Sequence, residues 1–360
     1  MSALTPPREH FCDPAQFRRE LEAIHFSMWL YAARADELPS VGSFVTRRFA
    51  DAEVLLVRDE AGVLRAFHNV CRHRGTRLCH DEAGRVAGLI QCRYHAWTYR
   101  LDGRLEKAFH MEEVEGFRAE DFPLASVAVA EWGGFVFVCL SASPPPFAEH
   151  LAGLDVKFAA WQLDELVTVE RRAYTLKANW KLVVANYHEC LHCPVAHPQL
   201  NRLSHYLSGD NEPMQPTYMG ARMELKPGVT TLSTSMSPPR SPLPGLNDEQ
   251  RRHVYYYALL PNLLLNLHPD YGVAFRMNAA AVDRTEVVCE WLMHRDEVAR
   301  PGFDASDAID FWHQTNLQDW ELSDLAQAGI SSRGYRPGPY SNREDLLVAF
   351  DEWVLAKLVR

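Results

Sequence analysis

Two short pairs of cysteine and histidine residues are the first candidate metal ligands in the chain. Cys71-Arg-His73 is followed, after eighteen residues, by Cys92-Arg-Tyr-His95. Each pair follows a β-rich run, so each is expected in a loop at the end of a strand. Two such loops can hold a compact metal centre between them, and the sequence therefore predicts a metal site here.

Two kinds of metal centre use two cysteines and two histidines. A tetrahedral zinc ion is one, but zinc fingers usually place both cysteines in one pair and both histidines in the other. In this chain each pair carries one residue of each type. That alternation favours a Rieske [2Fe–2S] cluster, in which two cysteines bind one iron and two histidines bind the other. Cys79 and His80 lie between the pairs, and Cys79 is interpreted as a buried small residue of the loop.

A second candidate metal site lies in residues 179–197, which read NWKLVVANYHECLHCPVAH. The pattern is helical up to Pro194, so Glu189 and His192, three residues apart, are expected on one face of a helix. His197 follows the helix break, which lets both imidazoles turn towards one point. Two histidines and a carboxylate leave open positions on Fe(II) for oxygen and substrate, which predicts a mononuclear iron site.

Other ligands have to be weighed at this second site. Cys190 and Cys193 form a CxxC that could bind zinc together with the histidines, but consecutive ligands on one continuous helix cannot readily all face one metal. We therefore favour iron and interpret both cysteines as packing residues. The third ligand should be a distant carboxylate, and the residues alone do not distinguish the acidic candidates of the late helix, which are Asp307, Asp310, Asp319, Glu321 and Asp324.

The composition excludes several classes of protein. The chain has 360 residues and a net charge of −10 without a basic run, so no nucleic-acid partner is expected. No apolar stretch approaches the roughly 20 residues that span a bilayer, so no membrane segment is expected. The N-terminus shows no signal-peptide pattern, which predicts a cytoplasmic protein whose eight cysteines are reduced thiols or metal ligands.

The elements that must position these residues follow from periodicity and turn signals. Residues 13–38 are expected to be helical, because Asp13 and Pro14 form a cap and first turn before apolar residues at helical spacing. Short β-rich runs fill residues 42–140, and Asp102-Gly103 between two of them predicts a hairpin. The Pro-rich residues 141–153 are interpreted as a linker. Beyond the linker we expect a strand at 167–176, a helix at 180–192, three or four strands between 253 and 294, and helices at 307–329 and 344–359.

Several motifs together resemble one family. CRHRG and CRYHAWTY resemble the Rieske ferredoxins and Rieske non-haem iron oxygenases, and NWKLVVANYHECLHCPVAHP resembles the iron-site motif of the oxygenase α (terminal oxygenase) subunits. QDWELSDLAQAG followed by SSRGYRPGPY matches the family's C-terminal pattern around its aspartate ligand, which selects Asp319. The ECxHC form is most similar to the branch of carnitine, choline and glycine betaine monooxygenases. The resemblance spans almost the whole chain.

The resemblance implies an α+β fold, in which a β-rich Rieske [2Fe–2S] domain precedes a helix-grip-like catalytic domain with an antiparallel sheet and a mononuclear iron. The expected division is an N-terminal helical segment packing on the catalytic domain (1–40), a Rieske domain (41–150) and a catalytic domain (151–360). It also implies a role for each site residue. These are Cys71, His73, Cys92 and His95 as cluster ligands, His192, His197 and Asp319 as ligands of mononuclear Fe(II), and Glu189 as a bridge that carries electrons from His95 of a neighbouring chain to His192, within a homotrimer.

The implied function is that of a terminal oxygenase that uses O2 to hydroxylate or oxidatively demethylate a small organic molecule. No flavin or nicotinamide fingerprint occurs, so electrons must come from a separate NAD(P)H-dependent flavin or iron–sulfur reductase, directly or through a ferredoxin. A quaternary ammonium substrate is expected from the ECxHC resemblance and from aromatic side chains that could form a cation–π box, namely Tyr187, Tyr206, Tyr218, Tyr255, Tyr257 and Trp291. An aromatic acid is the alternative substrate, and an electron-transfer Rieske protein is the alternative class.

Overall fold

The computed structural model describes residues 3–235 and 240–359, and the chain forms two compact units. One unit is Trp29–Pro144, and the other combines Met1–Met28 with Pro145–Arg360. We call them the β-rich unit and the larger unit. The predicted division at residues 40 and 150 follows from the family resemblance and stays a prediction. In the part of the chain that the structure describes, no helix is long and apolar enough to cross a membrane.

The β-rich unit consists of antiparallel sheets built from short strands. Phe135–Cys139 and the neighbouring Leu30–Arg34 are buried along their whole length, because both faces of these strands pack against other parts of the chain. The seven-stranded sheet has the order β1 (Leu30–Arg34), β10 (Phe135–Cys139), β9 (Ser126–Trp132), β4 (Leu64–His68), β3 (Ala52–Arg58), β2 (Ser43–Phe49) and β5 (Ala83–Arg85). The three-stranded sheet has the order β6 (Leu89–Gln91), β7 (Thr98–Arg100) and β8 (Leu105–Lys107).

The predicted hairpin at Asp102-Gly103 is confirmed, and it anchors the small sheet. Gly103 has φ +89°, and a Cβ atom there would lie 2.4 Å from the ring of Phe67, so only glycine fits the turn. The Asp102 carboxylate accepts a hydrogen bond from the backbone N–H of Arg104 at 3.1 Å. The turn thereby packs the small sheet against the apolar core that also contains Cys71 and Cys92.

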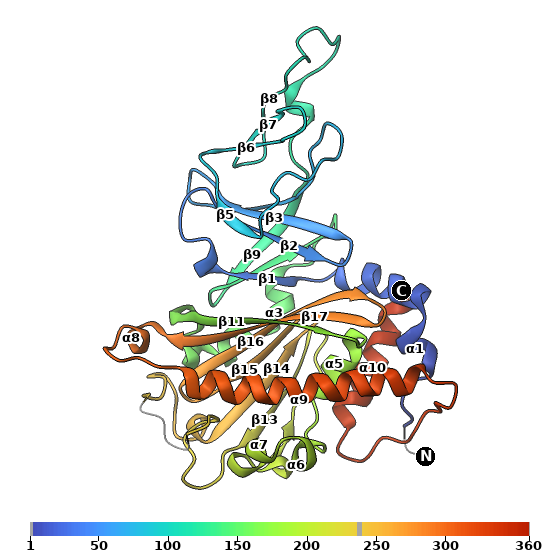
Figure 1. The fold of residues 1–360 in the computed structure, drawn as a ribbon, viewed down its shortest axis with the longest axis vertical. Coiled ribbons are helices and arrows are strands. Elements are labelled where there is room, and N and C mark those ends of the chain that lie inside the picture. Colours follow the sequence, from blue (N-terminus) through green and yellow to red (C-terminus); the bar gives the residue numbers. More distant parts are fainter. Residues whose placement is uncertain (1–2, 236–239, 360) are drawn as a thin grey trace. The chain divides into compact units, whose positions relative to one another are not determined.

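The larger unit is a seven-stranded antiparallel sheet covered by helices. The long helix α9 (Ser306–Ser331) runs across one face of the sheet (Figure 1), and α5 (Trp180–Tyr187) contacts both α9 and the strands. The strand order is β11 (Leu166–Leu176), β17 (Arg284–His294), β16 (Tyr271–Ala281), β15 (Leu263–Leu267), β14 (His253–Leu259), β13 (Tyr218–Glu224) and β12 (Asp210–Asn211). The remaining α-helices of this unit are α1 (Arg8–Cys12), α2 (Pro14–Glu20), α3 (Phe147–Leu151), α4 (Leu154–Lys157), α6 (Cys193–Ala196), α7 (Pro198–Leu203), α8 (Arg295–Val298) and α10 (Asp345–Leu358).

The N-terminal helix predicted at 13–38 is wrong in its second half. Helix α2 and a π-helical turn end at His25, and the chain then enters the fully buried strand β1. Periodicity cannot separate a short apolar run in a helix from one in a strand, and pairing with β10 decides for the strand. Within the larger unit, the buried carboxylate of Glu20 binds the ammonium group of Lys181 on α5 at 2.6 Å. The N-terminal helices are thereby fixed to the helix that leads into the second metal-site motif.

Helix α5 is shorter than the predicted helix at 180–192. It begins after Asn179, whose side chain caps the N–H of Lys181, and it ends at Tyr187. A new helix, α6, begins at Cys193 with Pro194 in its first turn, where proline is well tolerated. Glu189 and His192 therefore lie in the turn between two helices rather than on one helix face.

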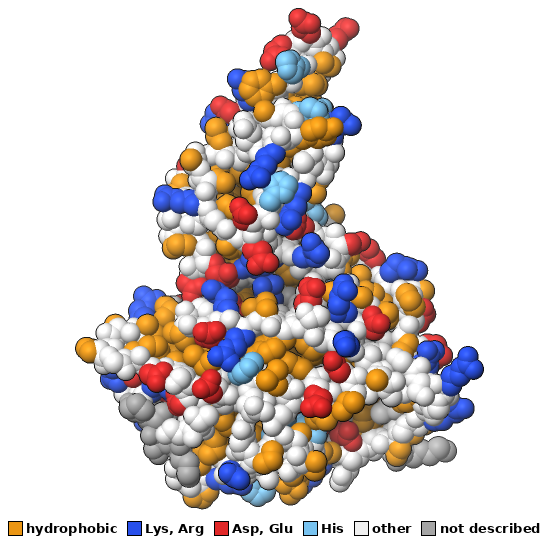
Figure 2. All heavy atoms as spheres, viewed as in Figure 1, with side chains coloured by type: hydrophobic (Ala, Val, Ile, Leu, Met, Phe, Trp, Pro, Cys, Tyr) orange, Lys and Arg blue, Asp and Glu red, His pale blue; other side chains and the backbone are white. Residues whose placement is uncertain are grey.

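Acidic and basic side chains are intermixed over the described residues of the face in Figure 2. This distribution agrees with an acidic chain that lacks a basic run.

Candidate metal centres and cavity

The first set of predicted ligands lies on two turns with the same backbone hydrogen bonds. In each turn the cysteine N–H donates to the carbonyl five residues later, Cys71 to Thr76 and Cys92 to Trp97, both at 2.8 Å. The cysteine carbonyl accepts from the amide four residues later, at 3.0 Å in both turns. That fourth position has a positive φ in both cases, +71° at Gly75 and +55° at Ala96. The two turns are thus equivalent cradles that present a cysteine and a histidine each.

The side chains of these turns converge. Cys71 and Cys92 are buried free thiols that interact with each other, and the rings of His73 and His95 are 4.7 Å apart. The Nδ1 atom of His95 is buried and has no hydrogen-bond partner among the described residues. Two thiols beside two imidazoles, one with an orphaned ring nitrogen, fit the donor set of a Rieske cluster.

Tyr99 is a contact that the sequence motifs did not indicate. Its hydroxyl group is buried, accepts a hydrogen bond from the N–H of Arg72 at 3.0 Å, and lies 3.3 Å from Cys71 Sγ. Because the amide occupies a lone pair of the hydroxyl oxygen, the O–H proton is available to the sulfur. Burial raises the pKa of the Cys71 thiol, and the Tyr99 hydrogen bond acts in the opposite direction.

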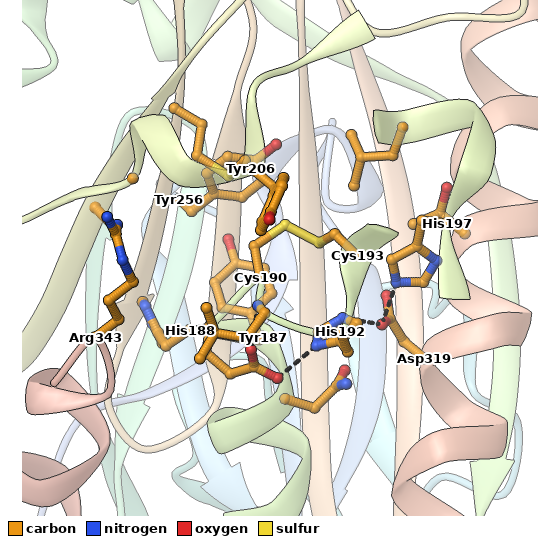
Figure 3. Close-up of a pocket in the computed structure, with 18 of the residues that line it drawn as sticks. Tyr187, His188, Cys190, His192, Cys193, His197, Tyr206, Tyr256, Asp319 and Arg343 are labelled. Atoms are coloured by element: carbon orange, nitrogen blue, oxygen red, sulfur yellow. Dashed lines mark hydrogen bonds and ion pairs between the residues drawn. A yellow bond between two sulfur atoms is a disulfide. The ribbon is translucent and has the colours of Figure 1, made fainter. Parts of the chain in front are cut away.

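The second set of predicted ligands also converges, from three separate elements. The Oδ1 atom of Asp319, on α9, lies 3.2 Å from Nε2 of His192 and 2.8 Å from Nε2 of His197 (Figure 3). Two atoms bound about 2.1 Å from one metal ion and at right angles to each other are about 3.0 Å apart. Both distances from Asp319 Oδ1 therefore fit neighbouring ligands of one metal ion.

The outward nitrogen of each histidine also has a partner. Nδ1 of His192 donates to Glu189 Oε1 at 2.5 Å, and Nδ1 of His197 donates to Gln318 Oε1 at 2.8 Å. Hydrogen bonds of this kind fix the tautomer and leave Nε2 free to bind a metal. Glu189 meets His192 as predicted, although through a turn. The contact of Gln318 was not predicted, and its position beside Asp319 is the only sequence signal that could have indicated it.

The electrostatics of this cluster favour a cation. Burial lowers the pKa of His192, but its hydrogen bonds to Asp319 and Glu189 outweigh burial and raise the pKa to about 9. Burial raises the pKa of Asp319, but its hydrogen bonds to the two histidines outweigh burial and lower the pKa. Negative charge is therefore concentrated next to the two nitrogen donors.

The other acidic candidates on α9 have different surroundings. Asp307 pairs with Arg240, and Asp324 accepts a hydrogen bond from the N–H of Lys177 at 2.7 Å. Asp310 and Glu321 are both exposed, and Asp310 forms an ion pair with Arg172 at 3.9 Å. Among the five candidates, Asp319 is the one that contacts both histidines.

The two cysteines of the second motif form a disulfide, Cys190–Cys193. The expectation that all eight cysteines are reduced thiols or ligands is therefore wrong for this pair. Cys193 Sγ lies within 4.8 Å of nitrogen atoms of His192 and His197, but a disulfide sulfur carries no thiolate to bind a metal. The disulfide thus removes both sulfurs from the alternative zinc site.

A cavity of about 460 Å³ opens beside this cluster. His192, His197 and Asp319 form part of its wall. Of the six aromatic residues predicted to form a box, Tyr187 and Tyr206 line the cavity, whereas Tyr218, Tyr255, Tyr257 and Trp291 do not. The aromatic side chains that line it are Tyr187, Tyr206, Tyr256, Phe275, Trp312 and Trp320.

The correction at Tyr255-Tyr256-Tyr257 follows from strand geometry. Successive side chains of a strand point to opposite faces, so Tyr256 faces the cavity while its neighbours face the other side of β14. There Tyr255 packs on Trp161 and Tyr257 on Phe158. Three tyrosines in a row therefore contribute one side chain to the cavity.

The two units and their sites define an iron oxygenase with a Rieske domain, and comparison with known proteins agrees. Residues 28–118 match the family model of the Rieske [2Fe-2S] domain, and residues 163–359 match that of the ring hydroxylating alpha subunit (catalytic domain). The chain belongs to the Rieske non-haem iron oxygenases, as a terminal oxygenase (α) subunit. Its cofactors are a Rieske [2Fe–2S] cluster and a mononuclear iron, and a separate reductase supplies its electrons.

Several individual proteins are similar to this chain over most of its length. The chain is 34% identical to the glycine betaine monooxygenase oxygenase subunit of Chromohalobacter salexigens, over 96% of this chain and 84% of that protein. It is 29% identical to the carnitine monooxygenase oxygenase subunit of Escherichia coli K12, over 93% and 86%. The crystal structure of the quaternary ammonium Rieske monooxygenase CntA with an inhibitor superposes with a TM-score of 0.86, at 25% identity, covering 100% of this chain and 96% of that one. Naphthalene 1,2-dioxygenase from Rhodococcus shares the fold, with a TM-score of 0.81 at 18% identity.

Proposed function

We propose that this oxygenase hydroxylates or oxidatively demethylates a small quaternary ammonium compound. The observation that carries the proposal is the cavity, in which six aromatic side chains adjoin the His192–His197–Asp319 cluster. Aromatic faces attract an alkylated ammonium group through their quadrupoles, whereas they offer nothing comparable to a simple anion. The glycine betaine and carnitine monooxygenases among its relatives support the same substrate class.

The proposal assigns a role to each ligand residue. Cys71, Cys92, His73 and His95 would hold the cluster, and His192, His197 and Asp319 would hold Fe(II). When bound, the cluster and Fe(II) supply stored electrons and the activation of O2. The protein's part is to fix the two imidazoles through Glu189 and Gln318, and to pack the aromatic side chains of the cavity around the reacting carbon.

We further propose that Glu189 connects subunits. Oε1 of Glu189 accepts from His192 Nδ1 and Oε2 accepts from the N–H of Leu191, and the side chain is still partly exposed, so each oxygen keeps a lone pair for a further donor. In a homotrimer that contact would be His95 of a neighbouring subunit, as the family resemblance implies. A cytoplasmic location is part of the proposal, because the separate reductase draws on NAD(P)H.

The test is a substrate screen with the iron-loaded oxygenase and a surrogate reductase. Product formation is measured rather than NADH loss, because O2 reduction without substrate oxidation also consumes NADH. We expect oxidation of glycine betaine or carnitine, with formaldehyde released when a methyl group is the site of attack, and three iron atoms per chain. Turnover of an aromatic acid and not of any trimethylammonium compound would overturn the substrate assignment. A chain that binds only two irons after full reconstitution would overturn the site assignment.

A further inference from the structure

The disulfide Cys190–Cys193 lies in the turn that also carries His192, and both of its cysteines line the cavity (Figure 3). Cys193 is buried, and its Sγ atom lies within 4.8 Å of nitrogen atoms of His192 and His197. Cys190 is partly exposed and does not belong to that group of atoms. A sulfur atom that has no role in the proposed iron site is therefore held at the edge of that site.

The backbone holds Cys193 in this position in addition to the disulfide. Its N–H donates to the carbonyl of Cys190 at 3.1 Å, and its carbonyl accepts from the N–H of His197 at 2.9 Å. The carbonyl of His192 accepts from the N–H of Ala196, also at 2.9 Å. Because these hydrogen bonds do not involve sulfur, breaking the S–S bond leaves Cys193 beside the same two imidazoles.

A dithiol reductant can break this disulfide by thiol–disulfide exchange. A thiolate of the reductant attacks Sγ of Cys190, the less buried of the two residues, and forms a mixed disulfide while Cys193 leaves as a thiolate. The second thiol of the reductant then displaces Cys190, so the dithiol loses two electrons and becomes a disulfide while the two cysteines become thiols. Disulfides in cytosolic proteins are usually transient and catalytic or redox-sensing, which agrees with such an exchange.

A free thiolate at Cys193 would change the metal that the site prefers. Thiolate is a soft ligand that favours zinc, and zinc takes four ligands from cysteine, histidine and carboxylate groups. Sulfur and nitrogen ligands of one tetrahedral zinc ion are about 3.6 Å apart, so Cys193 Sγ has to approach the imidazoles by little more than about 1 Å. Rotation about its Cα–Cβ bond allows this movement once the S–S bond is broken. Asp319 already contacts both imidazoles and is in place as the fourth ligand.

We propose that reduction of the Cys190–Cys193 disulfide converts the iron site into a zinc site in which Cys193 is an added ligand. The inference rests on the proposed function, because the other three ligands are those proposed for iron. The disulfide thereby keeps a thiolate out of the iron site, so that three protein ligands leave positions open for O2 and substrate. Four protein ligands fill a tetrahedral zinc site and leave none open.

The experiment uses the full chain with its Rieske cluster in place and with the mononuclear metal removed by a chelator. Two variants lack the disulfide equally and differ only in the sulfur that remains. Cys190→Ser keeps Cys193, and Cys193→Ser keeps Cys190. Each protein is given equal amounts of Zn²⁺ and Fe²⁺ without oxygen, and the bound metals are counted. Zinc K-edge X-ray absorption then reports the ligands of zinc alone, without a contribution from the cluster.

The variant Cys190→Ser should behave like the parent protein after reduction with a dithiol that is then removed. In both, zinc should have one sulfur ligand at about 2.3 Å. The ratio of zinc to iron should exceed that of the oxidised parent about tenfold or more, because loss of a hydrogen bond to a metal ligand already changes affinity about 10- to 100-fold. Zinc bound to Cys193→Ser or to the oxidised parent should have only nitrogen and oxygen ligands.

The outcomes separate this inference from the proposed function. Cluster absorption and thermal unfolding show whether each variant is folded. Zinc without a sulfur ligand in both Cys190→Ser and the reduced parent, or no zinc in either, would overturn the inference and leave the proposed iron site standing. A sulfur ligand in Cys193→Ser as well would overturn the assignment to Cys193. If the oxidised parent binds no metal here while Cys190→Ser binds zinc through sulfur, the zinc site stands and the proposed function falls.

Discussion

The Oδ1 atom of Asp319 lies 2.8 Å from Nε2 of His197, although 122 residues separate the two along the chain. Long helix α9 and the turn before α7 bring them together across one face of the sheet. If both hold the mononuclear iron, Asp319→Ala should lose that iron and all turnover while the absorption and EPR of the Rieske cluster survive. Asp324→Ala is the matched control on the same helix and should keep three irons. The reverse pattern in metal analysis would reassign the ligand to Asp324.

Gln318 provides a milder change at the same place. Gln318→Leu removes the acceptor of His197 Nδ1, so the imidazole loses the contact that fixes its tautomer. Changes of this kind typically lower metal affinity about 10- to 100-fold. We expect that loss in an iron competition titration, with Gln318→Glu, which keeps an acceptor, close to the parent. Parent-like affinity in Gln318→Leu would mean that the hydrogen bond does not position His197.

Glu189→Gln tests the proposed bridge between subunits. The amide keeps the size of the side chain but removes its charge, so the His192 imidazole loses its anionic partner. The variant should keep three irons, its oligomer and substrate binding, and should slow reoxidation of the reduced cluster in a single turnover with substrate and O2. Reoxidation with product at the parent rate, in both Glu189→Gln and Glu189→Ala, would refute the bridge.

Tyr99→Phe tests the hydroxyl group beside Cys71. A hydrogen bond to a ligand sulfur stabilises the more negative, reduced cluster, so its removal should lower the reduction potential by roughly tens of millivolts, the equivalent of one hydrogen bond. Protein-film voltammetry or a redox titration followed by EPR measures the shift. Tyr94→Phe changes an exposed tyrosine next to His95 and should leave the potential unchanged. Equal potentials in parent and Tyr99→Phe would contradict the prediction.

Stability should fall in mild acid because of buried neutral histidines. Burial first, and the charge of Lys181 second, lower the pKa of His25 to about 3, against about 6.5 in the unfolded chain. Below pH 6.5 the imidazole of His25 is protonated in the unfolded chain and stays neutral in the folded chain. The free energy of unfolding therefore decreases as the pH falls towards 3. Between pH 7 and pH 5 this costs about 2 kcal/mol for one imidazole.

The measurement is urea unfolding at both pH values. Between pH 7 and pH 5 the free energy of unfolding should decrease by about 1 to 2 kcal/mol less in His25→Phe than in the parent, whatever the effect of the substitution at pH 7. His205 is exposed, so His205→Gln should show the same decrease in unfolding free energy as the parent. Asp351, whose pKa is raised to about 6 by burial, acts in the opposite direction, because its folded form takes up a proton first. If the free energy of unfolding decreases equally in His25→Phe and in the parent, His25 does not contribute to the pH dependence of stability.

The sequence predicted the chemistry of both sites better than their local structure. The spacing of the cysteines and histidines indicated the cluster, because few metal centres are bound by two pairs that each contain one cysteine and one histidine. Spacing could not show that Glu189 and His192 lie in a turn, since a helix and a turn both bring residues i and i+3 together. Asp319 was selected by family resemblance, because a carboxylate on a helix has no local signature until the partner 122 residues away is placed.

Contacts that depend on strand register or on long-range packing could not be predicted from the sequence. Strand β1 looked helical because its apolar run has no strict period, and only its pairing with β10 defines it. The aromatic residues of the cavity could not be chosen without knowing which face of β14 is turned inward.

The alternation of Tyr255, Tyr256 and Tyr257 has a consequence for how this branch can diversify. Position 256 touches whatever enters the cavity, while positions 255 and 257 pack on Trp161 and Phe158 on the opposite face. A substitution at position 256 can therefore alter substrate preference while the packing of residues 255 and 257 stays in place. Descendants of a common ancestor that acquired different substrates should differ at this position and keep aromatic residues on either side of it.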